Sequence, residues 1–346
     1  MIKSIRSSEM GNHPLLKVED LVVDFSSENG PVTAVEGVSF ELQSGQMLGL
    51  VGESGCGKSV TSLSVMQLLP RPAGRIRSGK ILFDSEQGRL DLARLSPLEM
   101  SGVRGKEISM IFQEPMTALN PVKTVGSQLA ECFELHFSTM TGSEIRSKSV
   151  ELLERVKIAA PEERFSEYPH QLSGGMRQRV MIAMALACGP KLLIADEPTT
   201  ALDVTVQAQI LDLIKEIQKD LEMAVIFITH DLAVVSEICD SVVVMYAGKV
   251  IETCEKREIF ESPRHPYTKG LMGSIPRLDS KRKTLLPTIL GAVPSLSEMP
   301  KGCRFSDRCS EAKDVCGSEV PTVSLSANHS VSCHLFVEQK YGKTTP

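Results

Sequence analysis

The clearest chemistry lies in eight residues that match the phosphate-binding pattern G-x-x-x-x-G-K-[ST]: Gly52, Glu53, Ser54, Gly55, Cys56, Gly57, Lys58 and Ser59. Glycines allow backbone N–H groups to fold around β- and γ-phosphates, and a following helix N-terminus adds positive potential. Lys58 supplies a positive charge to the same phosphates, and the Ser59 hydroxyl can ligate Mg²⁺. Val60, the next residue, is also expected to contact the nucleotide. Because a buried strand precedes the loop and a helix follows it, the sequence predicts a nucleoside triphosphate site and not a chance glycine-rich turn.

Two carboxylates form a second candidate group. Asp196 and Glu197 directly follow a short apolar stretch, residues 191–195, that reads as a buried strand. Ligands of open parallel sheets bind at the C-terminal ends of the strands, so both side chains should face the phosphate loop. Asp196 suits Mg²⁺, and Glu197 can orient or deprotonate an attacking water. A bare Asp-Glu pair also occurs in solvated loops, but the preceding strand and Pro198 favour a functional role here.

A second anion-binding helix N-terminus is predicted at Ser173, Gly174 and Gly175. A small hydroxyl residue and two glycines open a predicted helix, as the binding of an anion by helix N–H groups requires. One nucleotide rarely needs two such helix ends in one chain. This second one is therefore expected to bind the γ-phosphate held by another subunit.

The elements that must position these residues alternate between strands and helices. An Asn29-Gly30 turn joins the first two predicted strands, and proline stops the helix after the phosphate loop. The expected elements are strands 15–25, 32–42, 47–51, 81–84, 108–112, 192–195 and 224–228, helices 59–69, 174–188 and 205–221, a helical stretch 121–159, and a hairpin of 242–246 with 249–253. The fold class is therefore α/β, with an antiparallel β subdomain, a helical insertion and an irregular C-terminal extension.

Composition excludes several partner classes. The 346 residues are 42% hydrophobic and 23% charged, carry a net charge of −5, include no Trp and have 4% aromatics. The negative charge argues against electrostatic binding of nucleic acid, and the few aromatic residues argue against a surface on which bases stack. The longest apolar run, residues 180–188, is far shorter than the roughly 20 residues that span a bilayer, and no apolar signal core opens the chain. A cytoplasmic chain that is not itself transmembrane is expected.

In their order, these motifs strongly resemble the ATP-binding subunits of ABC transporters, a family of P-loop NTPases, over residues 15 to about 271. The resemblance implies that Gln113 touches Mg²⁺ and the attacking water, and that His230 hydrogen-bonds the γ-phosphate. It implies that Ser173, Gly174 and Gly175 are the signature motif and that Asp203 couples the two sites of a dimer. Phe25 is the candidate for stacking on adenine, although a strand phenylalanine is more often core.

Narrower features, including Arg264-His265-Pro266-Tyr267-Thr268 and the cysteine-bearing tail, resemble the dipeptide and oligopeptide importer subfamily. That resemblance implies a heterodimer with a second homologous ATPase, two membrane permeases, and an extracytoplasmic binding protein, at the inner face of the cell membrane. Nickel or glutathione remains an alternative cargo, and a soluble non-transport ABC ATPase is a further alternative. Four residues would form a docking groove for a permease or belong to the hydrophobic core of the helical subdomain: Met116, Leu119, Pro121 and Val122. The expected limits are a tail at 1–14, an ATPase domain at 15–270 with its helical subdomain at about 114–188, and an extension at 271–346.

The nine cysteines divide into two groups. Four lie in the last 44 residues, and four thiolates suit a zinc ion or an iron–sulfur cluster: Cys303, Cys309, Cys316 and Cys333. The resemblance favours a 4Fe–4S cluster, because some similar importer subunits hold one; zinc and free thiols remain alternatives. Cys56 lies at a helix N-terminus near Lys58, where a thiol pKa can fall. It is either a reactive thiol or a small residue that merely fits.

Overall fold

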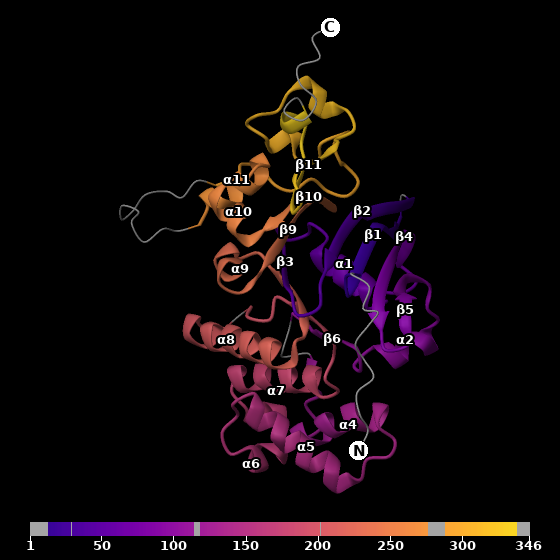
Figure 1. The fold of residues 1–346 in the computed structure, drawn as a ribbon, viewed down its shortest axis with the longest axis vertical. Coiled ribbons are helices and arrows are strands. Elements are labelled where there is room, and N and C mark those ends of the chain that lie inside the picture. Colours follow the sequence, from indigo (N-terminus) through magenta and orange to yellow (C-terminus); the bar gives the residue numbers. More distant parts are fainter. Residues whose placement is uncertain (1–12, 29, 114–117, 201, 276–287, 338–346) are drawn as a thin grey trace.

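A computed structural model of the chain describes residues 13–28, 30–113, 118–200, 202–275 and 288–337. These residues form two sheets (Figure 1). The smaller sheet has the order β2-β1-β4-β5, and the larger has the order β11-β12-β10-β9-β3-β8-β7-β6. The strands of the larger sheet are β3 (Met47–Val51), β6 (Ile108–Ile111), β7 (Leu192–Asp196), β8 (Ala224–Thr229), β9 (Ser241–Tyr246), β10 (Lys249–Glu255), β11 (Thr322–Ser326) and β12 (His329–Ser332).

The smaller sheet is the predicted antiparallel β subdomain. Its strands are β1 (Leu16–Ser27), β2 (Gly30–Leu42), β4 (Gly74–Ser85) and β5 (Gly88–Asp91). Along β1, Leu16, Val18, Leu21 and Val23 are buried in one hydrophobic core. The helix α1 (Lys58–Val65) ends well before Pro70, and α2 (Pro97–Val103) begins at a capping box of Ser96 and Glu99.

Five strands of the larger sheet, β9-β3-β8-β7-β6, run parallel and carry the candidate site. Both faces are buried, since Leu192 and Ile194 of β7 pack in the core shared with the β subdomain, whereas Leu193 and Ala195 pack in the helical core. This two-residue alternation explains why the strand is apolar throughout. The helices of the second core include α7 (Gly174–Leu186), α8 (Val204–Leu221) and α9 (Leu232–Ile238).

The predicted helical insertion is present at one end of the molecule (Figure 1). It contains α4 (Val125–His136), α5 (Gly142–Arg155) and α6 (Pro161–Phe165). Thr141 and Glu144 form a capping box that starts α5, and Leu129 and Leu153 are buried where these helices pack. As predicted, this stretch holds no strand among its described residues.

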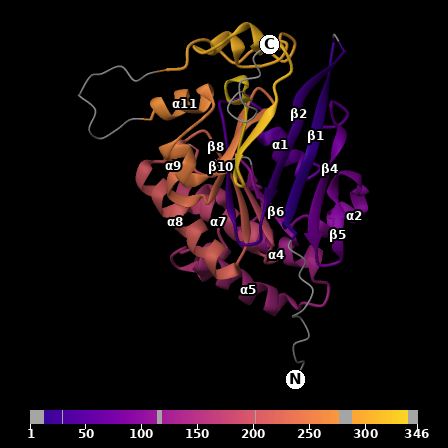
Figure 2. The same ribbon diagram turned by 45° about the horizontal axis from the view of Figure 1, so that its top comes forward.

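The C-terminal extension is more regular than the sequence predicts. After α10 (Lys256–Glu261) and α11 (Pro266–Gly273), residues 322–332 form the hairpin β11-β12, and β12 pairs antiparallel with β10. The extension thereby lengthens the larger sheet, at the end of the molecule away from α4 and α5 (Figures 1 and 2). The prediction of an irregular extension misses the β11-β12 hairpin, because two short strands with little apolar patterning give a weak signal alone. The domain limits stay predictions.

Candidate functional site

The strand order brings the predicted site residues to one sheet edge. The phosphate loop follows β3, His230 follows β8, Asp196 and Glu197 end or follow β7, and Gln113 lies shortly after β6. Because β3, β8, β7 and β6 are consecutive parallel neighbours, their C-terminal ends meet at one edge. The carboxylates therefore face the same side as the phosphate loop, as the sequence predicts.

The phosphate loop has the conformation that its glycines allow. Gly52, Gly55 and Gly57 have positive φ angles of 154°, 79° and 100°. A Cβ on Gly52 would lie 2.2 Å from the Met245 carbonyl oxygen, so only glycine fits there. The ammonium of Lys58 is buried and donates to the carbonyl oxygens of Gly52, at 2.8 Å, and Glu53, at 3.1 Å. The loop is thus a preformed cradle with a cation inside it.

Asp196 fits a magnesium ligand. Its side chain is buried, and its Oδ1 has no hydrogen-bond partner among the described residues. Burial raises the pKa of Asp196, while a hydrogen bond from Ser59 opposes that rise. An unpartnered buried carboxylate oxygen beside a serine hydroxyl is a donor set that Mg²⁺ prefers. Asp196 and Ser59 are therefore the residues that could hold the ion.

Three side chains converge on the Glu197 carboxylate. Gln113 Nε2 donates to Oε2 at 3.0 Å, the Thr200 hydroxyl donates to Oε2 at 3.1 Å, and His230 Nδ1 lies 3.3 Å from Oε1. Burial alone raises the pKa of Glu197, but hydrogen bonds from His230 and Thr200 outweigh it, so the pKa is lowered overall. Glu197 also has a left-handed φ of 46°, a strained conformation that occurs more often at functional sites.

The predicted signature residues face solvent at the start of α7. Ser173 and Gly174 are exposed, and the Ser173 hydroxyl accepts a hydrogen bond from the Met176 N–H at 3.3 Å as the cap of α7. Asp203 caps α8 in the same way, accepting from the Val206 N–H at 3.0 Å. Both caps stabilise their helices by about 1 kcal/mol. Their roles toward a second subunit stay predictions.

Three further residues that the sequence predicts at the nucleotide site are Phe25, Cys56 and Val60. Phe25 is half-buried, packs on the β-subdomain core and lies against Gly74, and its stacking on adenine stays a prediction. The hypothesis of a low pKa at Cys56 is wrong. Its thiol is fully buried, and this burial raises the pKa by more than the nearby Lys58 lowers it. Cys56 is the small residue that fits beneath the loop. Val60 is half-buried within α1.

The four C-terminal cysteines are brought together. The Cys303 N–H donates to the Cys316 carbonyl oxygen at 2.8 Å, and Cys309 follows a short 3-10 turn, Ser306–Arg308. Burial raises the pKa of Cys333 to about 11, and the other three thiols add to the rise. None of the nine cysteines forms a disulfide. Four thiols suit either candidate metal group by their chemistry, but no three of these sulfurs lie within 4.8 Å of one another among the described residues.

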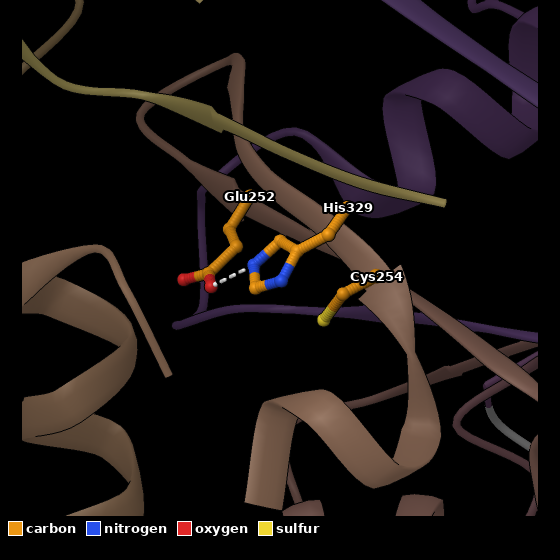
Figure 3. A group of neighbouring side chains, drawn as sticks. All are labelled: Glu252, Cys254 and His329. Atoms are coloured by element: carbon orange, nitrogen blue, oxygen red, sulfur yellow. Dashed lines mark hydrogen bonds and ion pairs between the residues drawn. The ribbon is translucent and has the colours of Figure 1, made fainter. Parts of the chain in front are cut away.

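A second metal-like group lies on the extended sheet (Figure 3). One ligand atom each of Glu252, Cys254 and His329 lie within 4.8 Å of one another. The Glu252 carboxylate, however, already accepts from the N–H groups of Arg264, at 2.8 Å, and His265, at 2.9 Å, and lies 2.9 Å from His329 Nε2. Burial raises the pKa of Cys254. The group is therefore explained as a polar anchor that joins β12, β10 and the turn before α11.

Sequence reasoning missed two residues that touch the phosphate loop. The Glu53 N–H donates to the Tyr267 hydroxyl at 2.9 Å, and Arg308 pairs with the Glu53 carboxylate at 2.6 Å. Tyr267 lies in a motif that the sequence singles out, at 264–268, but only as a mark of the subfamily. Arg308 lies 255 residues from its partner, and no local pattern reports such a contact.

Comparison with known proteins now identifies the family. Residues 35–200 match the family described as ABC transporter, and residues 251–316 match the C-terminal region of oligopeptide and dipeptide transporters. The dipeptide transport ATP-binding protein DppD of Bacillus subtilis is 52% identical over 322 residues, 93% of this chain and 94% of the relative. The chain belongs to the ABC transporter ATP-binding proteins.

Further relatives of these ABC proteins agree with the predicted fold and ATPase activity. The oligopeptide transport ATP-binding protein OppD of the same organism is 51% identical over 323 residues, 93% of this chain and 89% of the relative. A dimeric structure of the ATP-binding cassette MJ0796 bound to ADP and Pi has a TM-score of 0.62 and 26% identity, covering 70% of this chain and 99% of that chain. No helix in the described parts of this ABC ATPase is long and apolar enough to cross a bilayer.

Proposed function

We propose that this ABC ATPase energises the import of dipeptides or oligopeptides across the cell membrane, where it would be a peripheral subunit. The convergence of Gln113, Thr200 and His230 on Glu197, beside the phosphate loop, carries the hydrolytic part of the proposal. The cargo is supported by the similarity to dipeptide and oligopeptide transport ATP-binding proteins. Nickel or glutathione is the alternative cargo.

In the proposed mechanism, the phosphate loop binds the β- and γ-phosphates of ATP through its N–H groups and Lys58. Ser59 and Asp196 would hold Mg²⁺, which neutralises phosphate charge when bound. Glu197 has a lowered pKa and is therefore ionised at neutral pH, ready to take a proton from the attacking water. Gln113 would orient that water, and His230 would contact the γ-phosphate.

A second ATPase subunit would complete the site. Ser173, Gly174 and Gly175 are exposed or half-exposed in this chain, as a helix end that binds a partner's γ-phosphate must be. Asp203, beside the same interface, would couple the two sites, and Phe25 would stack on adenine. Closure with ATP and reopening after hydrolysis would then alternate the access of a membrane pore. A binding protein would deliver the cargo.

Two permease subunits are the remaining proposed partners. A surface cavity of about 640 Å³ lies beside the helical insertion, lined by residues that include Pro121, Val122, Tyr168 and His170. Val122 is 79% exposed, which suits a docking contact. Leu119 is 3% exposed and is therefore core, and Met116 lies outside the described residues.

We also propose that Cys303, Cys309, Cys316 and Cys333 hold a 4Fe–4S cluster. Four thiolates around one zinc, at about 2.3 Å each, would bring their sulfurs within about 3.8 Å of one another. Among the described residues, no three of these sulfurs lie within 4.8 Å of one another, so they do not form a zinc site as placed. The cluster is supported by the four thiols in one short segment and by the resemblance to importer subunits that hold one. A colourless preparation made without oxygen that contains stoichiometric zinc would contradict the assignment.

The decisive experiment is to purify the intact complex with its binding protein and to measure ATP hydrolysis with candidate cargoes. Dipeptides and oligopeptides should stimulate hydrolysis, whereas nickel chelates and glutathione should not. Stimulation by nickel or glutathione alone would replace the cargo assignment. Failure to copurify with any permease would favour a non-transport ATPase.

A further inference from the structure

Every polar group of Glu53, the second residue of the phosphate loop, is engaged. Its N–H donates to the Tyr267 hydroxyl at 2.9 Å. Its carbonyl oxygen accepts from Lys58 Nζ, at 3.1 Å, and from the Cys56 N–H, at 3.3 Å. Its carboxylate is paired with Arg308 through two hydrogen bonds, at 2.6 and 3.1 Å. Glu53 is therefore tied to the C-terminal extension by its side chain and to the rest of the loop by its backbone.

Arg308 is built into this position and is not a mobile surface cation. Its side chain is 7% exposed. Nε donates to the Leu290 carbonyl oxygen at 2.9 Å, Nη1 donates to Glu53 and to the Tyr246 hydroxyl at 3.3 Å, and Nη2 donates to Glu53 and to the Ile289 carbonyl oxygen at 3.4 Å. All five guanidinium N–H groups are used, so lysine cannot replace this side chain.

Aromatic packing fixes the segment that carries Arg308. The ring of Phe305 lies 5.1 Å from that of Tyr246 and 5.4 Å from that of Tyr267, centroid to centroid. His265 accepts from the Tyr267 N–H at 3.1 Å, and burial lowers the pKa of His265 to about 3. His265 therefore stays a neutral acceptor at physiological pH and keeps Tyr267 in place beneath the phosphate loop.

The cysteines continue the same framework. Arg308 directly precedes Cys309, and the Ser306 N–H donates to the Cys303 carbonyl oxygen at 3.0 Å. The short turn that bears Arg308 is thus enclosed between two of the four thiols. The thiols and the guanidinium are therefore carried by the same short segment.

We propose that Arg308 is a positioning residue for ATP binding, which holds the phosphate loop open through Glu53, and that the cysteine segment sets ATP affinity through this contact. The physical reason is preorganisation. A loop already held in its binding conformation loses less entropy when phosphate binds. This inference concerns ATP affinity and is independent of the cargo.

The test uses the full-length chain and equilibrium binding of a fluorescent ATP analogue, with thermal unfolding measured in the absence of nucleotide. Arg308→Gln should raise the Kd for the nucleotide about tenfold, as expected for the loss of a buried bidentate pair. Arg308→Lys should not restore affinity, and Glu53→Gln should raise the Kd by a smaller factor. In the assembled transporter, KM for ATP should rise while kcat changes less than twofold.

A matched control removes a nearby cation that does not touch the loop. Lys269 pairs with Glu311 at 3.5 Å, and both side chains are nearly half exposed. Lys269→Gln should leave the Kd unchanged. If Arg308→Gln lowers only the unfolding temperature and the folded protein binds nucleotide normally, the proposal is wrong. If Arg308→Gln fails to fold, Glu53→Gln decides alone: an unchanged Kd would overturn the proposal.

The link to the cysteines is tested by combining substitutions. Cys309→Ser should raise the Kd in the natural background and have no further effect in Arg308→Gln, because both act through the same contact. Kd increases that multiply in the double variant would show that the cysteine acts by another route, and would overturn that part of the proposal.

Discussion

The phosphate loop and the signature loop are both glycine-containing helix N-termini, but the structure treats them differently. The phosphate loop is held on several sides, by Lys58 inside it, by Tyr267 and Arg308 through Glu53, and by the Gly248 N–H, which donates to the Cys56 carbonyl oxygen at 2.8 Å. At the signature loop, by contrast, Ser173 and Gly174 are exposed, and the Ser173 side chain caps its own helix.

If the proposed site is shared between two subunits, this difference shows which half of it the chain completes alone. A preformed cradle can bind phosphate without a partner, because its donors need no rearrangement. An exposed helix end offers donors that remain hydrated until another surface covers them. The contrast predicts that substitutions in the phosphate loop weaken ATP binding, whereas substitutions in the signature loop reduce ATP turnover and leave ATP binding intact.

The largest effect should come from the carboxylate next to the phosphate loop. Glu197→Gln removes the proposed base and retains the shape of the side chain, so kcat for ATP should fall at least about 100-fold. ATP binding should persist, and the variant should accumulate as an ATP-bound closed dimer, detectable by size-exclusion chromatography with ATP and Mg²⁺. Glu216→Gln, an exposed surface change, is the control. Normal turnover in the assembled complex would contradict the assignment of Glu197.

Substitution at the signature loop should sharpen the comparison. Ser173→Arg places a long side chain where a partner's γ-phosphate should lie, and should reduce turnover by about tenfold or more. Binding of a fluorescent ATP analogue to the isolated chain should change less than twofold, because the phosphate loop is intact. A large loss of binding in the isolated chain would show that the two loops are not independent.

A matched pair of glycine substitutions compares the two loops by stability. Gly52→Ala forces a Cβ to within 2.2 Å of the Met245 carbonyl oxygen at a φ of 154°, and should lower the free energy of unfolding by about 3 kcal/mol. Gly174→Ala meets no atom within 4 Å and should change it by less than about 0.5 kcal/mol. Urea unfolding of both variants makes the measurement. Equal losses would contradict the idea that only one loop is braced.

The smallest effect is expected at Cys56. Because its thiol is buried and its pKa is raised, alkylation of the native chain at pH 7 should be slow with or without ATP. Cys56→Ser should change the Kd for ATP less than twofold, since serine has nearly the same size. Rapid labelling of Cys56 that ATP blocks would restore the rejected hypothesis of a reactive thiol.

Much of the fold could be predicted because its signals are local. The strand β3 (Met47–Val51) has the predicted limits. The helix α8 (Val204–Leu221) and the hairpin around Ala247 and Gly248 differ from their predicted limits by only one or two residues. The β11-β12 hairpin and α11 were missed, because their short apolar patterns take their meaning from the sheet and loop against which they pack.

The sequence by itself determined the chemistry of the nucleotide site. Residue types at fixed spacing after strands, such as Lys58, Asp196 and His230, meet if their strands are parallel neighbours, and the alternation of strands and helices predicts a parallel sheet. The order of those strands is visible only in the structure. Only the tertiary structure decided that Cys56 is buried and that the Glu53 carboxylate is paired with Arg308. Burial and contacts between residues hundreds of positions apart depend on packing, which no local pattern of residues encodes.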